Sequence, residues 1–228
     1  MAGSDPDRDD VKRLVRRHWD DRAETFDEQP EHGIHSDAQR ARWLAVLEQW
    51  TPDEPRRALD VGCGTGVLAL LLAELGHDVV GFDAAHAMVQ QARRKTGDRA
   101  VEVALGDATR LGVADDAVGI AVERHLLWTL PDPGAALAEW RRVVAPGGRI
   151  VCFEGQWDHD EPRGEYEMIH GELPGYDGWS RDSLAGSLAD AGLVDVEAAP
   201  LADPVLRGRK PEDSLPHDYV VAAGTVPR

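Results

Sequence analysis

Three glycines at alternate positions, Gly62, Gly64 and Gly66, follow a short apolar run, and Asp60 lies two residues before the first of them. Glycine lets a backbone turn sharply and approach a ligand closely. The leucine-rich stretch over 67–75 has helical spacing, so the unpaired N–H groups of its first turn would face the same ligand. The pattern D-x-G-x-G-x-G therefore predicts a strand, a ligand-binding turn and a helix.

Two common ligands of such turns do not fit this one. A dinucleotide-binding turn needs a small residue where Val67 stands, and a P-loop needs a Gly-Lys-Ser/Thr sequence. The acids that end the next two apolar runs indicate another ligand. Asp83 could accept both hydroxyl protons of a ribose, and Asp107 could accept a hydrogen bond from an adenine amino group. Together these residues describe a site for a ribose and an adenine without a pyrophosphate. Because the site is acidic, it also suits a ligand with positive charge, such as a sulfonium and an ammonium group.

These residues come at the ends of predicted strands that alternate with predicted helices. Such alternation indicates right-handed crossovers and a doubly wound, largely parallel α/β sheet, whose ligands bind beyond the carboxyl ends of the strands. The predicted strands cover 58–61, 78–82, 101–105, 117–122, 149–153, 194–196 and 217–223. The predicted helices cover 67–75, 86–95, 134–144 and 180–191, and a turn at 146–148 is expected after the third of them.

The first part of the chain is predicted to form two helices outside this alternation. In the first helix, Val11, Val15 and Trp19 share one face, which either packs on the body or forms a lid whose Trp19 edge reaches a ligand. Ser36 is expected to begin the second helix, which ends before the prolines at 52 and 55.

Four short motifs follow one another along the chain. They are Leu59-Asp60-Val61-Gly62-Cys63-Gly64-Thr65-Gly66, Gly81-Phe82-Asp83, Gly106-Asp107-Ala108 and Val143-Val144-Ala145-Pro146-Gly147-Gly148. In order and spacing, over about residues 57–153, this set resembles the motifs of class I S-adenosylmethionine-dependent methyltransferases. The resemblance implies an enzyme with S-adenosylmethionine as cofactor and a Rossmann-like seven-stranded sheet of order 3-2-1-4-5-7-6, with the last strand antiparallel.

The resemblance also implies which residues contact the cofactor. Asp60 and the glycine turn would lie along its methionine part, and Asp83 would hold the ribose. Met88 would cover the adenine, whose edge Asp107 would bind together with Ala108. The predicted cofactor set is Trp19, Asp60, Gly62, Cys63, Gly64, Gly66, Asp83, Ala84, Met88, Asp107, Ala108 and Glu123.

The chain departs from this family's pattern in two places. Phe26 stands where the family often has a tyrosine, which removes a hydroxyl that could reach the methionine carboxylate. An aromatic–Asp pair is usual where this chain has Ala117-Val118-Gly119. We expect the second departure to affect packing more than chemistry.

The stretch 123–133 follows the fourth strand, where the acceptor meets the methyl group in this family. His125 is the best-placed titratable group, and at an ordinary pKa of about 6.5 it could accept a proton from a hydroxyl or ammonium nucleophile. Alternatively it fixes the loop or contacts the methionine end of the cofactor. Methyl transfer needs no covalent intermediate, so positioning and desolvation can supply much of the acceleration without a base. Trp128 is a predicted acceptor contact.

The irregular stretch 156–179 is the predicted acceptor cap. Its aromatic residues include Trp157 and Tyr176, and rings beside carboxylates suit a cationic or amine-bearing acceptor. The alternative is a solvated acidic loop on an acidic protein. His159 and His170 lack tight metal-ligand spacing, as do the histidines at 32 and 35, so no metal is predicted.

Composition narrows the expected partners. The net charge of −17 over 228 residues disfavours nucleic acid and anionic membranes, because their phosphates would be repelled. Two cysteines without metal-ligand spacing favour a reducing cytoplasm, and no apolar run has the length of a membrane span or the form of a signal peptide. We expect a cytoplasmic monomer or homodimer that acts on a small molecule.

These observations predict a single methyltransferase domain over 1–228. Its parts would be an N-terminal helical lid (1–56), a cofactor-binding core (57–155), the acceptor cap (156–179) and a C-terminal helix with strands (180–228). The expected reaction methylates an oxygen or nitrogen of a small, amine-bearing acceptor in specialised metabolism. The alternatives are other sulfonium chemistry on the same fold, by intramolecular cyclisation or aminopropyl transfer, and a non-catalytic cofactor-binding accessory protein.

Overall fold

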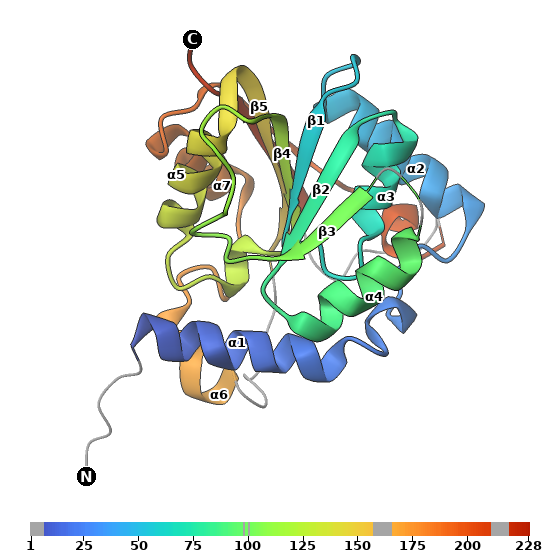
Figure 1. Ribbon diagram of the computed structural model, residues 1–228, viewed down its shortest axis with the longest axis vertical. Helices are drawn as coiled ribbons and strands as arrows, with labels where there is room; N and C mark the ends of the chain where they lie inside the picture. Colours follow the sequence, from blue (N-terminus) through green and yellow to red (C-terminus); the bar gives the residue numbers. More distant parts are fainter. Residues whose placement is uncertain (1–6, 98, 100, 157–165, 211–218) are drawn as a thin grey trace.

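The computed structural model describes residues 7–97, 99, 101–156, 166–210 and 219–228. Within these residues seven strands form one sheet of order β3-β2-β1-β4-β5-β7-β6, which confirms the predicted fold (Figure 1). The strands are β1 (Arg57–Val61), β2 (Asp78–Asp83), β3 (Val101–Leu105), β4 (Val118–Arg124), β5 (Val144–Gly155), β6 (Val194–Pro200) and β7 (Tyr219–Thr225). All neighbouring pairs are parallel except those of β7, which runs antiparallel to β5 and β6.

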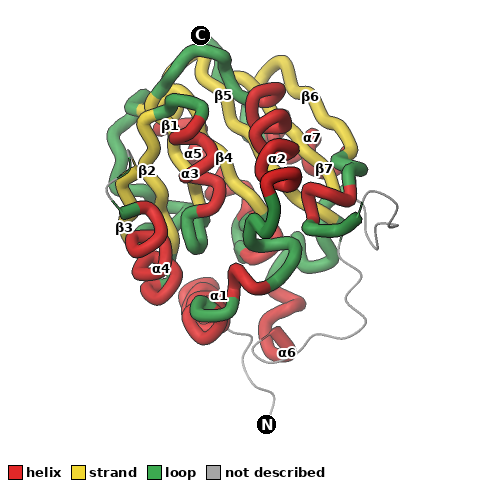
Figure 2. Tube along the Cα trace, turned by 90° about the vertical axis from the view of Figure 1, so that its right-hand side faces the viewer, coloured by secondary structure: helices red, strands yellow, loops and turns green. Residues whose placement is uncertain are grey.

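Helices cover both faces of the sheet. The α-helices are α1 (Arg8–Arg22), α2 (Asp37–Trp50), α3 (Val67–Glu74), α4 (His86–Thr96), α5 (Pro133–Val143), α6 (Tyr166–Ile169) and α7 (Arg181–Asp190). Four 3-10 turns are η1 (Phe26–Glu28), η2 (Leu127–Thr129), η3 (His170–Glu172) and η4 (Pro204–Arg207). Helices α2, α3 and α4 lie on one face and α5 and α7 on the other, while α1 and α6 lie beyond one end of the strands (Figures 1 and 2).

Local sequence signals explain where these helices begin. The Ser36 side chain accepts a hydrogen bond from the Gln39 N–H at 3.1 Å, which caps α2 as predicted. Asp132 caps α5 in the same way, and Pro133 occupies the first helical position, where its missing N–H has no partner to lose. Two apolar cores result, one on each face, with Trp43 of α2 in the first and Trp140 of α5 in the second.

Strand β5 begins earlier than predicted. The predicted turn at 146–148 lies inside β5 as an irregularity, because Val118 pairs with Val144 whereas Ile120 pairs with Arg149. Gly147 has φ +80° and donates its N–H to the Val226 carbonyl at 2.8 Å. The predicted turn residues therefore form a bulge that is hydrogen-bonded to the chain after β7, and α5 ends one residue sooner than expected.

The register places the predicted site residues along one edge of the sheet. Val61 of β1 is paired with Phe82 of β2 on one side and with Glu123 of β4 on the other. Asp83 of β2 is paired with Leu105 of β3. The loops that follow β3, β2, β1 and β4 therefore emerge side by side, in that order.

The described helices include none that is both long and apolar enough to cross a membrane.

Candidate functional site

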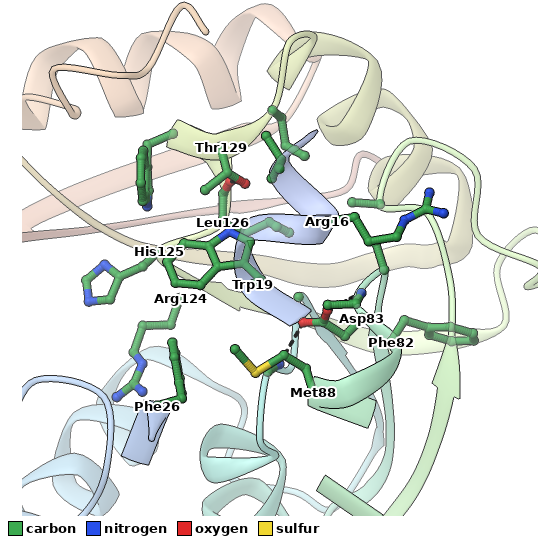
Figure 3. A pocket seen from close by; sticks show the side chains of 18 of the residues that line it. Arg16, Trp19, Phe26, Phe82, Asp83, Met88, Arg124, His125, Leu126 and Thr129 are labelled. Atoms are coloured by element: carbon green, nitrogen blue, oxygen red, sulfur yellow. Dashed lines mark hydrogen bonds between the residues drawn. The ribbon is translucent and has the colours of Figure 1, made fainter. Parts of the chain in front are cut away.

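A cavity of about 300 Å³ opens at this edge of the sheet, between the strand ends and helix α1 (Figure 3). Its size is that of a small-ligand site. Strand ends β1 to β4 contribute one wall, helix α1 and turn η1 contribute another, and Tyr219 of β7 reaches the inner end. The cavity is lined by eight of the predicted cofactor residues, namely Trp19, Gly62, Gly64, Asp83, Ala84, Met88, Asp107 and Ala108.

The glycine turn has the backbone that only glycine adopts without strain. Gly62 and Gly64 have φ of +68° and +53°, and both face the cavity. A Cβ at Gly62 would lie 2.9 Å from a Leu126 methyl group, so a side chain there would force Leu126 to move. The N–H groups of Gly62 and Cys63 both donate to the Phe82 carbonyl, at 2.7 and 2.9 Å, which holds the turn against β2.

Asp83 braces the turn from the neighbouring strand. Its two carboxylate oxygens accept hydrogen bonds from the Gly64 N–H at 2.9 Å and the Ala85 N–H at 2.8 Å. Burial raises the pKa of Asp83 to about 6, in spite of these two bonds. Each oxygen has a second lone pair, so the carboxylate can still accept hydroxyl protons from a ligand.

Asp107 is already partnered by a residue that the sequence did not suggest. Its Oδ2 accepts a hydrogen bond from Lys12 Nζ of α1 at 2.9 Å, and its Oδ1 accepts from the N–H and hydroxyl of Thr109. Burial works to raise the pKa of Asp107, but the bonds from Lys12 and Thr109 hold it below its usual value. Lys12, Arg16 and Trp19 all line the cavity at helical spacing, which is the signal that could have identified Lys12.

Four predicted cofactor residues lie outside the cavity lining. Asp60 and Glu123 are buried beneath it, with exposed fractions of 1% and 0%. Cys63 packs behind the turn, where its sulfur lies 3.0 Å from the position of a Cβ on Gly81. Gly66 has φ +84° and caps helix α3. The structure thus places none of these four residues in the cavity lining.

The inner end of the cavity carries His125 at the start of the loop after β4. His125 has φ +61°, its N–H donates to the Phe153 carbonyl at 2.9 Å, and its ring centroid lies 5.1 Å from that of Tyr219. Burial and the neighbouring charge of Arg124 lower the pKa of His125 well below 6.5. The imidazole is therefore neutral at physiological pH, which makes it a weak general base.

Arg124 is a half-buried cation that lines the cavity beside His125. Its Nη2 donates to the His32 carbonyl at 2.7 Å, and its guanidinium lies 5.1 Å from the centroid of the Trp43 ring. Its Nη1 is buried and has no hydrogen-bond partner among the residues that the structure describes. The sequence signal was the run of ionisable residues, 123–125, directly after an apolar strand.

A second group that sequence reasoning missed joins distant parts of the chain at this inner end. Glu31 accepts hydrogen bonds from Arg207 Nη2 and from the Tyr219 hydroxyl, both at 2.8 Å. The Arg207 guanidinium also lies 3.5 Å from the centroid of the Tyr219 ring. Burial works to raise the pKa of Glu31, but the bonds from Tyr219 and Arg207 hold it below its usual value.

Two buried carboxyl groups support the loop after β4 from below. Glu123 accepts a hydrogen bond from the Leu126 N–H at 2.9 Å, and Glu154 of β5 accepts one from the Trp128 N–H at 3.3 Å. Burial raises the pKa of Glu123 to about 8 and that of Glu154 well above its usual value. Glu123 is therefore largely protonated at neutral pH.

The predicted acceptor residues have different positions. Trp128 lines the cavity, whereas Tyr176 is 9% exposed and belongs to an aromatic and apolar cluster under α1. Tyr166 connects the two, with ring centroids 5.4 Å from Trp128 and 5.8 Å from Tyr176. Trp157 and His159 lie outside the described residues. Among the residues that are described, no three His, Cys, Asp or Glu side chains gather as a metal site would require.

Comparison with known proteins identifies the same region. Residues 59–152 match the family model described as a methyltransferase domain. The demethylmenaquinone methyltransferase of Thermus thermophilus is 40% identical over 123 residues, which cover 51% of this chain and 53% of that protein. The chain spans about half the length of the curated relatives it matches.

Solved structures show the same fold over nearly the whole chain. Haemonchus contortus phosphoethanolamine N-methyltransferase 2, in complex with phosphomonomethylethanolamine and S-adenosylhomocysteine, has a TM-score of 0.71 at 16% identity, covering 96% of this chain and 61% of that one. The [4+2]-cyclase SpnF has a TM-score of 0.68 at 20% identity, covering 100% of this chain and 99% of that one.

Proposed function

We propose that this chain, a class I S-adenosylmethionine-dependent methyltransferase, transfers the cofactor's methyl group to an oxygen or nitrogen of a small-molecule acceptor. The observation that carries the proposal is the row of strand ends at one cavity. Asp107, Asp83 and the glycine turn line it side by side, in the order in which the family's motifs contact adenine, ribose and methionine.

The residues present fit S-adenosylmethionine. Asp83 has free lone pairs for the ribose hydroxyls, and Met88, which is 2% exposed, offers an apolar surface for the adenine. Gly62 and Gly64 line the cavity without side chains, which leaves room beside the turn for the methionine chain. When bound, the cofactor supplies a methyl group made electrophilic by a sulfonium charge.

The chain's own residues position the acceptor and exclude water. Leu126, Trp128 and Leu130 line the cavity after β4 and give it an apolar wall; Figure 3 shows Leu126 there. A dry, shaped wall of this kind favours a reaction that depends on positioning and desolvation. We propose His125 as the group that contacts the acceptor, and its neutral imidazole can accept a hydrogen bond from a hydroxyl or amine.

The acceptor that fits this wall is a small molecule with an apolar body, and an amine on it would find aromatic faces nearby. The described part of the predicted cap, 166–179, is proposed to cover it, because this segment approaches the loop after β4: a Cβ on Gly175 would lie 2.8 Å from the Trp128 Cα. A net charge of −17 disfavours nucleic acid as the acceptor.

Isothermal titration with S-adenosylmethionine tests the cofactor half of the proposal. We expect the unaltered chain to bind the cofactor and Asp83→Ala to bind it tenfold or more weakly. The reason is that the substitution removes the carboxylate that would accept hydrogen bonds from the ribose hydroxyls. Asp78→Ala is the matched control, because Asp78 begins the same strand at its other end and its side chain is 72% exposed. Equal affinity of Asp83→Ala and Asp78→Ala would overturn the proposal.

Adenosylhomocysteine release across a panel of phenols, carboxylic acids and amines tests the transfer half. The second candidate function is a reaction other than methyl transfer on the same fold. It is retained because a [4+2]-cyclase shares this fold over the whole chain. A product formed without net formation of adenosylhomocysteine would support that candidate. Tight cofactor binding without turnover on any member of the panel would instead indicate a non-catalytic accessory protein.

A further inference from the structure

Arg124 occupies the next place in the row of strand ends. In the register, Glu123 lies opposite Val61, and Val61 lies opposite Phe82, so Arg124, Gly62 and Asp83 follow one another across β4, β1 and β2. Neighbouring strands are about 4.8 Å apart, which puts the end of β4 roughly 10 Å from the end of β2. A ligand whose ribose lies at Asp83 and whose chain crosses the glycine turn would end at Arg124.

The guanidinium of Arg124 lacks a counter-ion in the described part of the chain. No carboxylate there forms an ion pair with it, and its buried Nη1 has no hydrogen-bond partner while Nη2 is fixed by the His32 carbonyl. Asp60 acts on Arg124 only through its field, and burial raises the pKa of Asp60 itself to about 7. Arg124 lines the cavity and is half-buried, so an anionic ligand there would offset part of the cost of burying its charge.

We propose that Arg124 binds the carboxylate of the cofactor's methionine moiety, an inference that rests on the proposed function. A guanidinium matches a carboxylate in shape and can donate two parallel hydrogen bonds. The same end of the cavity holds Phe26, which has no hydroxyl to offer that carboxylate (Figure 3). Arg124 supplies the donor that this position lacks.

An anionic acceptor is the other source of a carboxylate at this place. The two sources differ in one measurable way, because only the methionine carboxylate is removed by decarboxylating the cofactor product. The ligand pair for the experiment is therefore S-adenosylhomocysteine and its decarboxylated analogue, and no acceptor is needed.

Isothermal titration of both ligands into the unaltered chain, Arg124→Lys, Arg124→Gln and Arg16→Gln tests the proposal. The unaltered chain is expected to bind adenosylhomocysteine roughly 10- to 100-fold more tightly than the analogue, as for a charge-assisted pair. Arg124→Gln is expected to reduce this ratio to within about threefold of unity, and Arg124→Lys to give an intermediate ratio. Arg16, which lines the cavity one helical turn after Lys12, is the control for loss of charge, and its variant should keep the ratio unchanged.

Three outcomes would overturn the proposal. One is equal affinity of the unaltered chain for the two ligands, which needs no variant and so does not depend on whether Arg124→Gln folds. Another is a ratio that Arg124→Gln leaves unchanged, which would assign the methionine carboxylate to a different residue. The third is an equal loss of binding affinity for the two ligands, in both Arg124→Gln and Arg124→Lys. Failure of the unaltered chain to bind either ligand would instead contradict the proposed function.

Discussion

At the scale of single residues, Gly62 tolerates no side chain for two separate reasons. Its φ of +68° is strained for any other residue, and a Cβ would meet Leu126 at 2.9 Å. We expect Gly62→Ala to lower the free energy of unfolding by about 2 kcal/mol and to weaken cofactor binding. Urea unfolding with a titration measures both.

Gly186→Ala is the control for this substitution. Gly186 lies in helix α7, has open space around it and is expected to gain up to about 1 kcal/mol as alanine. If Gly62→Ala were as stable as Gly186→Ala, the tight approach of Leu126 would not constrain the turn.

His125 is expected to contribute through its position rather than as a base. Because its pKa is lowered well below 6.5, protonation of its imidazole is unfavourable. We expect His125→Asn, which tolerates the left-handed backbone, to lower kcat by less than tenfold on the acceptor found by the panel. A loss of 10²–10⁴-fold, the usual contribution of a general base, would contradict this.

At the scale of elements, Glu31 connects the loop after η1 to η4 and β7. Glu31→Gln removes the counter-charge of Arg207, which is 4% exposed. We expect a loss of about 2 kcal/mol in the free energy of unfolding, less than for a fully buried pair because the Glu31 side chain remains 28% exposed. Thermal or urea unfolding measures it.

Tyr219→Phe is the matched control, because it removes one hydrogen bond to Glu31 and keeps the ring under Arg207. Its expected loss is about 1 kcal/mol. Since the pKa of Glu31 is lowered by folding, its contribution should be present above its usual value and be lost as the pH falls through the folded value. Equal losses in the two variants would show that charge is unimportant here.

The elements also show how far the sequence predicts the site. The glycine turn and Asp83 follow from short local motifs, and the strand order follows from the family that these motifs resemble. The partners Lys12–Asp107 and Glu31–Tyr219 are separated by 95 and 188 residues, and no local pattern links them. Pairings of this kind depend on how α1 and β7 pack. The sequence therefore could not predict that Lys12 balances the negative charge of Asp107.

At the scale of the whole molecule, several carboxyl groups are buried with pKa values raised by folding. They are about 7 for Asp60, 6 for Asp83 and 8 for Glu123, with Glu154 well above its usual value. In the folded state these groups keep protons that the unfolded chain releases, so their contribution to stability falls as the pH rises through the folded values. We expect the ligand-free protein to be less stable at pH 8.5 than at pH 6.

Unfolding midpoints in urea between pH 6 and pH 8.5 measure this dependence. Glu154→Gln, which keeps the shape of the side chain but does not titrate, should make the stability depend less on pH. A midpoint that rises with pH in the unaltered chain would show that these carboxyl groups ionise at their ordinary values.

Tyr219 lines the cavity, and β7 lies between β5 and β6 in the sheet. During synthesis on the ribosome, β6 is therefore made before the strand that joins it to the sheet. The strand ends of β1 to β4 are all translated earlier, and Tyr219 is the last lining residue to be added. A ribosome stalled before β7 would display a chain whose cavity lacks this one side chain.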